Sequence, residues 1–237
     1  MVLDLDQKTT DARTALLRDA AQKRILILDG AMGTSIQALD LGPDDFGGPD
    51  LEGCNEMLNL VKPEAILGIH RSFLEAGADI VETNTFGSTP LVLAEYGLGD
   101  RAREISRAAA RIAREAAATF STPERPRFVA GSMGPTTKSI SVTGGITFDE
   151  LVAHYREQVC GLLEGGVDYL LVETSQDTLN VKAAMLGIQE ACRETGRNVP
   201  VVASCTIEAM GTMLAGQGVD AFYTSLEHLD LLAVGLN

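Results

Sequence analysis

The sequence contains no tryptophan, and aromatic residues make up only 5% of its 237 residues. A folded core must therefore be built from aliphatic side chains, and the 45% hydrophobic content is enough to supply one. No apolar run approaches the roughly 20 residues that a membrane-spanning helix needs. The first 24 residues also lack the apolar centre of a signal peptide. We therefore expect a folded protein that does not contact a membrane.

Cysteine and positive charge are scarce as well. The four cysteines, Cys54, Cys160, Cys192 and Cys205, form no CxxC pair, whereas a secreted disulfide scaffold is denser in cysteine. Free thiols in a reducing cytoplasm are the simpler interpretation. Lysine and arginine number 19 against 33 aspartates and glutamates, which gives a formal net charge of −14. A surface this acidic repels phosphate polyanions, so nucleic acid and anionic membranes are excluded as main partners.

What the sequence has instead is a regular alternation of apolar strands and amphipathic helices. Short apolar runs predict strands at residues 25–28, 79–84, 128–131, 169–174, 201–204 and 231–236. Helical spacing, caps and glycine stops predict helices at 11–23, 62–76, 101–118, 147–163, 178–194 and 219–228. Residues 40–61, rich in Gly, Pro and Asp, are expected to form a long loop. Strict alternation of this kind predicts an α/β fold with a parallel sheet.

An internal echo supports this fold class. Residues 75–83 and 164–174 both run through a helix end, a tight turn, a strand and a terminal Glu-Thr pair. Repeated βα units of this kind are the building blocks of barrels. Because such turns recur in many α/β proteins, the echo supports a fold and not a function.

Acidic side chains stand at the carboxyl ends of three predicted strands, where parallel α/β folds place their active groups. They are Asp29, Glu82 and Glu173. An acidic rim suits a ligand that carries an ammonium group. The same residues also have a structural interpretation, since Asp29 can cap its turn and the two glutamates can pair with neighbouring cations.

Other patterns are weaker. Gly30-Ala31-Met32-Gly33 lacks the third glycine of a dinucleotide fingerprint and the lysine of a P-loop. The histidines His70, His154 and His228 show no metal-binding spacing, so we interpret them as structural or surface residues. Cys205 ends a predicted strand at the rim, while the other cysteines are interpreted as small apolar residues. Spacing alone therefore names no reaction.

Ordered motifs along the chain resemble the homocysteine-binding domain of cobalamin-dependent methionine synthase, in the homocysteine S-methyltransferase family. These motifs are Leu28-Asp29-Gly30-Ala31-Met32-Gly33-Thr34, Asn55-Glu56-Met57-Leu58-Asn59-Leu60, Glu82-Thr83-Asn84-Thr85-Phe86, Gly131-Ser132-Met133-Gly134-Pro135-Thr136, Glu173-Thr174 with Asp177-Thr178-Leu179-Asn180, and Gly216-Gln217 with Ala221-Phe222-Tyr223. The resemblance runs from about Ile25 to the last residue. It implies a (β/α)8 TIM-barrel type of fold, here incomplete with about six βα units, preceded by a leader helix. The expected division is 1–24 for the leader and 25–237 for the barrel domain.

The resemblance also implies a reaction and its cofactors. In the family, three cysteine thiolates hold zinc, and the metal activates the thiol of homocysteine. The thiolate takes a methyl group from methylcobalamin, which is reloaded from 5-methyltetrahydrofolate, and the product is methionine. The partners implied are homocysteine and the folate- and cobalamin-binding modules of the same enzyme. Asp29 and Glu173 match the carboxyls that receive the ammonium group. Five further residues match the family positions that hold the carboxylate and the rest of the substrate: Gly30, Ala31, Thr83, Asn84 and Phe86. Met133 is expected to line the pocket.

The sequence departs from the family at the metal site. The first zinc cysteine is expected directly after Gly235-Leu236-Asn237, where the sequence ends, and the later Gly-Gly-Cys-Cys is missing. None of the four cysteines matches a ligand position, and Cys205 falls where the family commonly has glycine. We therefore expect a C-terminally truncated chain with no zinc ligand, no catalytic residue of its own and an exposed sheet edge.

Three alternatives remain open at this point. One is a stand-alone homocysteine S-methyltransferase with a betaine or methylsulfonium donor. Another is a non-catalytic, truncated remnant. A third is a generic phosphate-binding barrel, which would need a glycine-rich loop after a seventh strand.

Overall fold

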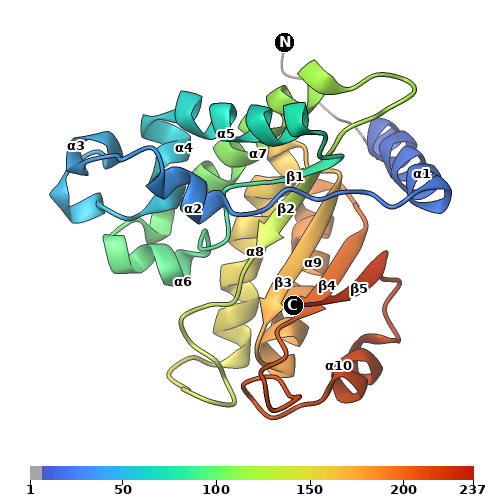
Figure 1. Ribbon diagram of the computed structural model, residues 1–237. Helices are drawn as coiled ribbons and strands as arrows, with labels where there is room; N and C mark the ends of the chain where they lie inside the picture. The colour runs from blue at the N-terminus through green and yellow to red at the C-terminus, as the bar shows by residue number, and fades with distance from the viewer. Residues whose placement is uncertain (1–6) are drawn as a thin grey trace.

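Five parallel strands, paired in chain order, form the sheet around which the chain is arranged (Figure 1). The computed structural model describes residues 7–237. The strands are β1 (Ile80–Glu82), β2 (Phe128–Met133), β3 (Tyr169–Ser175), β4 (Val201–Cys205) and β5 (Ala233–Leu236). Every neighbouring pair is parallel, so the carboxyl ends of all five strands meet at one edge. The predicted α/β class with a parallel sheet is confirmed.

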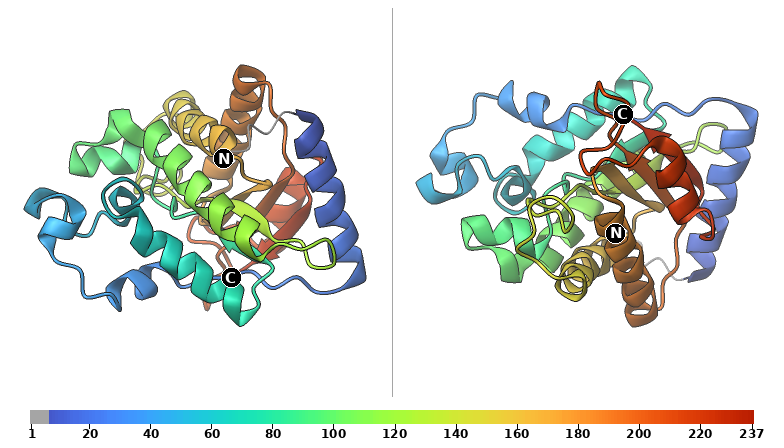
Figure 2. Two further views of the ribbon diagram at one scale, coloured as in Figure 1. Left: turned by 90° about the horizontal axis from the view of Figure 1, so that it is seen from above. Right: turned by 90° about the horizontal axis from the view of Figure 1, so that it is seen from below.

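A row of helices covers the outer face of the sheet. They are α5 (Pro63–Ala76), α7 (Ala102–Phe120), α8 (Phe148–Gly165), α9 (Thr178–Thr195) and the shorter α10 (Val219–Leu226). The helix α8 packs between α7 and α9 (Figure 2). Glycine permits this contact, because a Cβ at Gly161 would lie 2.4 Å from the Arg103 carbonyl oxygen. The largest hydrophobic cluster lies between these helices and the strands. Among the described residues, no helix combines the length and hydropathy that crossing a membrane requires.

The inner face of the sheet is covered at one end by α1 (Gln7–Lys23), on the far side of the strands from α7 and α8 (Figure 2). Alternate residues of a strand point to the same face. At the strand starts these inward residues are apolar, and Leu17 of α1 packs with them: Ile80, Phe128 and Tyr169. The helix predicted at 11–23 is therefore confirmed and extends further toward the N-terminus. The first six residues of the predicted leader lie outside the described residues, and the division at residue 24 stays a prediction.

The two segments of the internal echo have the same structure. The helices α5 and α8 both end at a glycine in the left-handed region, Gly77 with φ 114° and Gly166 with φ 97°. The aspartates that follow, Asp79 and Asp168, are buried and pair with arginine side chains at 2.5 Å and 2.7 Å. Burial raises the pKa of Asp79, but hydrogen bonds lower it to about 2, and the one from Arg24 contributes most to this lowering. Each unit is thus anchored at the strand start and leaves a Glu-Thr pair at the strand end.

Two N-terminal segments differ from the prediction. Residues 25–28 were expected to be a buried strand, but their only strand-type pairing among the described residues is a bridge between Leu28 and Ile80. Ile25 is 85% exposed, because this segment is at the edge of the sheet and no described strand pairs with its other side. The expected loop at 40–61 contains several short helical turns, two of which begin at proline. The short elements of the chain are α2 (Met32–Gln37), α3 (Pro43–Phe46), η1 (Pro49–Leu51), η2 (Asn55–Met57), α4 (Leu58–Val61), α6 (Pro90–Leu93), η3 (Ala94–Tyr96) and η4 (Gly99–Arg101).

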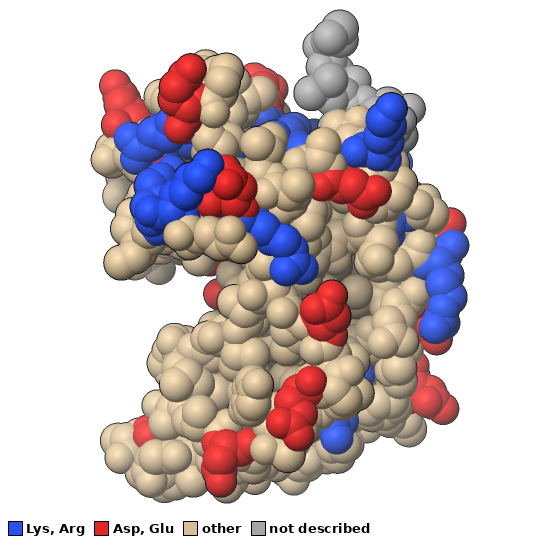
Figure 3. Space-filling model, turned by 90° about the vertical axis from the view of Figure 1, so that its right-hand side faces the viewer, with Lys and Arg blue, Asp and Glu red and all other residues tan. Residues whose placement is uncertain are grey.

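The two edges of the open sheet expose apolar side chains. Ile27 at one edge and Leu236 at the other are each 56% exposed, and Val234 is 37% exposed. The side of the molecule that carries α1, β5 and α10 is mostly uncharged, with scattered charged groups (Figure 3). Unpaired apolar edges promote association between chains.

We therefore expect a chain of these 237 residues to self-associate, and Val234→Lys with Leu236→Lys to reduce that association. Lysine on an edge strand disfavours pairing with another edge. Size-exclusion chromatography with light scattering measures the effect. The matched control is Met210→Lys, which replaces an exposed apolar residue outside both edges. A sharp, monodisperse monomer for the unmodified chain would contradict the expectation.

Candidate functional site

The carboxyl ends of the strands surround a cavity of about 360 Å³. All of the residues expected to bind substrate line this one cavity: Asp29, Gly30, Ala31, Thr83, Asn84, Phe86 and Glu173. The rest of its wall consists of Met32, Gly33, Asn55, Glu56, Glu82, Thr85 and Ser132. The structure thus brings the expected residues together, and their role in binding stays a prediction.

Asp29 connects two segments that are distant in the sequence. Its Oδ1 accepts a hydrogen bond of 2.8 Å from the backbone N–H of Glu82. Its own N–H donates to the carbonyl oxygen of Ile80 at 3.0 Å. On the other side, Oδ2 lies 3.8 Å from Nδ1 of His70, a fully buried residue of α5. The Asp29 side chain therefore holds the end of β1, rather than capping its own turn as its structural interpretation proposed, and it also lines the cavity.

Asp29, Glu82 and Glu173 place three carboxyl groups around the same space. Burial, together with the charges of Glu173 and Asp29, raises the pKa of Glu82 to about 9. Burial also raises the pKa of Glu173, although a hydrogen bond of 2.5 Å from Ser132 Oγ opposes the rise. No residue that lines the cavity is Lys, Arg or His. The alternative in which the two glutamates pair with cations around the rim is therefore wrong, and the cavity favours an entering cation.

Backbone strain occurs at two positions beside the cavity. Ala31 and Thr174 have φ angles of 53° and 56°, in the left-handed region that side chains with a Cβ rarely adopt. The register between β3 and β4 also shifts over residues 172–175. Strain of this kind persists only where the surrounding contacts impose it, and it concentrates at binding sites. Here it flanks Gly30 and Glu173.

A network of amide side chains forms another part of the wall. Asn84 Nδ2 donates to the Asn55 carbonyl oxygen at 2.8 Å, and Asn59 Nδ2 donates to the Asn84 carbonyl oxygen at 2.8 Å. Glu56 Oε1 accepts a hydrogen bond of 2.7 Å from the Gly87 N–H. Burial raises the pKa of Glu56 as well. These bonds hold the turn that follows β1 in one conformation.

Phe86 is the apolar part of the wall. The Gly134 N–H donates to its carbonyl oxygen at 3.1 Å, and a Cβ at Gly134 would lie 2.7 Å from its ring. Glycine is therefore required for this close approach. Phe86 remains 45% exposed as a residue, so it offers aromatic surface to a ligand.

Sequence reasoning missed some site residues and misplaced others. Glu56 lies in a quoted motif but carried no expected role, and His70 was interpreted as structural without its link to Asp29. His70 lies on the side of α5 that faces the end of a strand, and this position was the sequence feature that could have indicated its contact with Asp29. Met133 was expected to line the cavity; it points to the outer face of β2 and is buried in the main core. Cys205 is likewise fully buried in that core.

The cysteines do not form a metal centre. Within residues 7–237, no group of three or more His, Cys, Asp or Glu side chains could hold a metal ion. Burial raises the pKa of all four thiols, to about 11 for Cys54 and about 12 for Cys160, and also for Cys192 and Cys205. Because burial raises the pKa of these thiols, it disfavours the thiolate, which is the form that binds zinc.

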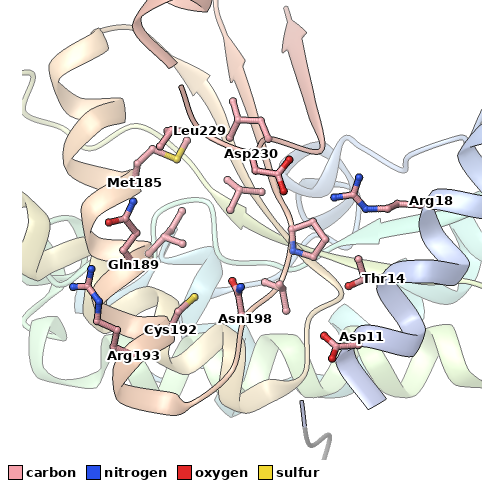
Figure 4. A pocket seen from close by; sticks show the side chains of 15 residues that line it. Asp11, Thr14, Arg18, Met185, Gln189, Cys192, Arg193, Asn198, Leu229 and Asp230 are labelled. Atoms are coloured by element: carbon pink, nitrogen blue, oxygen red, sulfur yellow. The ribbon is translucent and has the colours of Figure 1, made fainter. Parts of the chain in front are cut away.

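A larger cavity, of about 580 Å³, lies at the opposite end of the strands. Arg18 and Thr14 of α1 face Gln189 and Arg193 of α9 across it (Figure 4). In parallel α/β folds the chemistry takes place at the carboxyl ends of the strands. This cavity is at the strand starts, so the smaller one is the candidate site.

Comparison with known proteins gives consistent results. A family model described as homocysteine S-methyltransferase matches residues 26–237. Methionine synthase of Mycobacterium tuberculosis is 46% identical over 221 residues, and that of Mycobacterium leprae is 45% identical over 224 residues. These alignments cover 93% and 94% of this chain, but the chain spans only 18% of the length of either relative.

Solved structures share the fold. The metallated form of the homocysteine methyltransferase MmuM from Escherichia coli has a TM-score of 0.76 at 23% identity, and covers 93% of this chain and 77% of its own. The apo form of the same enzyme has a TM-score of 0.70 at 23% identity, and the match covers 93% of this chain and 75% of that enzyme's chain. This likeness confirms the expected TIM-barrel type of fold.

Proposed function

The chain belongs to the homocysteine S-methyltransferase family, and we propose that its strand-end cavity binds homocysteine as a methyl acceptor. The observation that carries this proposal is the cluster of Asp29, Glu82 and Glu173 in a cavity without a basic side chain. Carboxyl groups that repel one another are stabilised by a cation between them. The α-ammonium group of an amino acid is such a cation.

Each part of homocysteine has a matching surface in the cavity. Asp29 and Glu173 receive the ammonium group. The backbone at Gly30 and Ala31 lies beside its carboxylate, and the ring of Phe86 contacts the chain that carries the thiol. Binding favours the ionised carboxyls, so the pKa of Glu173 falls on binding and protons are released.

We further propose that the chain is the homocysteine-binding module of a methionine synthase, a methyltransferase that forms methionine in the cytoplasm. The identity of 46% to such an enzyme supports this. The resemblance then implies that methylcobalamin, reloaded from 5-methyltetrahydrofolate, donates the methyl group. The folate- and cobalamin-binding modules are the partners in this proposal.

The described residues do not fit the zinc that the family implies. Three thiolates are needed, whereas Cys54, Cys160 and Cys205 are buried in the cores, and Cys192 on α9 is half-buried and forms no three-ligand group with any described residues. No step of the mechanism is therefore assigned to zinc in this chain. The residues described here bind and orient the amino acid.

We expect this chain to hold no stoichiometric zinc and to transfer no methyl group by itself. The physical reason is the absence of a three-ligand cluster within the described residues. Metal analysis of chain purified in the presence of zinc measures this directly, and thiol-blocked chain is the control. One zinc ion per chain, lost on blocking the thiols, would contradict the expectation.

Titration calorimetry tests the proposed ligand. We expect homocysteine to bind, and 4-mercaptobutanoate, which lacks only the amino group, to bind about 100-fold more weakly because the carboxyl cluster is then left without a cation. Added zinc is expected to leave the affinity for homocysteine unchanged. Equal binding of the two compounds would rule out the ammonium site.

A further inference from the structure

His70 is fully buried on α5, and neither of its ring nitrogens has a hydrogen-bond partner among the described residues. Two unpaired polar atoms in a core lower the stability of the fold, so their retention needs an explanation. Nδ1 lies 3.8 Å from Oδ2 of Asp29, whose side chain is itself buried. This distance exceeds the roughly 3.2 Å limit of an N–H···O hydrogen bond, so the bond requires the two atoms to approach by about 0.6 Å.

Among the described elements packed around His70, Asp29 is the ionisable residue whose side chain lies near the ring. Of the elements packed against α5, α2 and α4 contain no titratable side chain. The strand β1 contains Glu82, whose backbone N–H already holds Oδ1 of Asp29. Of the charged side chains of α7, Arg114 is largely buried but pairs with Asp168, and the others belong to half-buried or exposed residues.

We propose that His70 is a positioning residue for Asp29, to which its Nδ1–H donates a hydrogen bond at Oδ2. Both oxygens of Asp29 are then fixed, one by the Glu82 amide and the other by the imidazole. His70 does not line the cavity, so it acts through Asp29 and does not touch the ligand. For its effect on ligand binding the inference rests on the proposed function, whereas the hydrogen bond itself does not.

The need for such a residue follows from the carboxyl cluster. A carboxylate held at one oxygen only can rotate about its last side-chain bond, and the charge of a neighbouring Glu173 carboxylate favours rotation of Asp29 away from the cavity. A donor behind Asp29 opposes that rotation and keeps the carboxylate oriented before a ligand arrives. Such preorganisation reduces the cost of binding.

Nitrogen-15 NMR of the imidazole rings tests the hydrogen bond without any ligand. The hydrogen bond fixes the tautomer, so we expect the neutral ring of His70 to carry its proton on Nδ1. His154→Asn and His228→Asn assign the three histidine signals, and Asp29→Asn is expected to change the protonation pattern of His70 alone. A neutral His70 ring protonated on Nε2 would overturn the proposal.

Two variants of similar size test the positioning role. The amide nitrogen of His70→Asn lies near the former Nδ1, whereas that of His70→Gln lies near the former Nε2. We expect His70→Gln to weaken homocysteine binding about 10-fold and His70→Asn to stay within about 3-fold of the unmodified chain. Thermal unfolding confirms that both fold, and His154→Asn on α8 is the matched control.

Equal loss of affinity in both variants would show that His70 only fills space, which contradicts the proposal. If the unmodified chain binds no homocysteine, the proposed function fails instead, and the ring protonation measured by NMR still decides whether His70 is bonded to Asp29. If both variants fail to fold, the same measurement on the unmodified chain decides.

Discussion

Asp29→Asn is expected to weaken homocysteine binding by about 100-fold, or roughly 3 kcal/mol. The substitution keeps the size of the side chain and an oxygen that can accept the Glu82 N–H, but it removes a charge from a buried site for an ammonium group. Breaking one side of a buried charge pair leaves the other charge uncompensated. Titration calorimetry with homocysteine measures the change.

Glu173→Gln is also expected to weaken homocysteine binding, but by less than Asp29→Asn. The hydroxyl of Ser132 can still donate to the amide oxygen of the glutamine, so the side chain keeps its position while it loses its charge. The matched control is Glu190→Gln on the exposed side of α9, which makes the same chemical change outside the cavity. Unchanged affinity in both Asp29→Asn and Glu173→Gln would contradict the placement of the ammonium group.

Glu82→Gln is expected to stabilise the fold at high pH, by about 6 kcal/mol at pH 9. Burial and two neighbouring carboxyls raise the pKa of Glu82 from 4.5 to about 9. The folded state therefore binds more protons than the unfolded state throughout this interval, so the free energy of unfolding falls as the pH rises from about 4.5 to about 9. A glutamine resembles the protonated glutamate and cannot ionise.

Denaturant unfolding at several pH values measures this effect. The stability of the unmodified chain should decline with rising pH more steeply than that of Glu82→Gln, and the two should converge near pH 4.5. Glu190→Gln, which removes an exposed carboxyl, should keep the slope of the unmodified chain. Parallel slopes for Glu82→Gln and the unmodified chain would show that Glu82 is not held protonated by the fold.

Much of the fold could be predicted from the sequence because its local signals agree with its packing. The capping box at Thr147 and Glu150 starts α8, and glycine at positions 77 and 166 ends α5 and α8. The prediction of a buried strand at residues 25–28 was wrong because a branched apolar run predicts a strand without indicating whether that strand is central or at an edge of the sheet. At an edge such a run has a partner on one side only, and Ile25 and Ile27 remain exposed.

The candidate site was predicted in part. The carboxyl ends of parallel strands meet at one edge, so Asp29 and Glu173 could be placed together from their positions after strands. Met133 was misplaced because a strand-end position does not tell which face a side chain takes. Period-2 alternation puts Ser132 on the inner face and Met133 on the outer face, and the choice between the two depends on the register of the sheet.

The sequence by itself determined the order of strands and helices and the acidic strand ends, since each depends on residues close together in the chain. It also determined the resemblance to a family, since that depends only on the order of motifs along the chain. Only the tertiary structure decided that Glu82 lies against Asp29 and Glu173 without a cation, and that His70 lies behind Asp29. These relations join residues that are tens of positions apart. They depend on burial, which sets the pKa of a carboxyl group and which no local pattern contains.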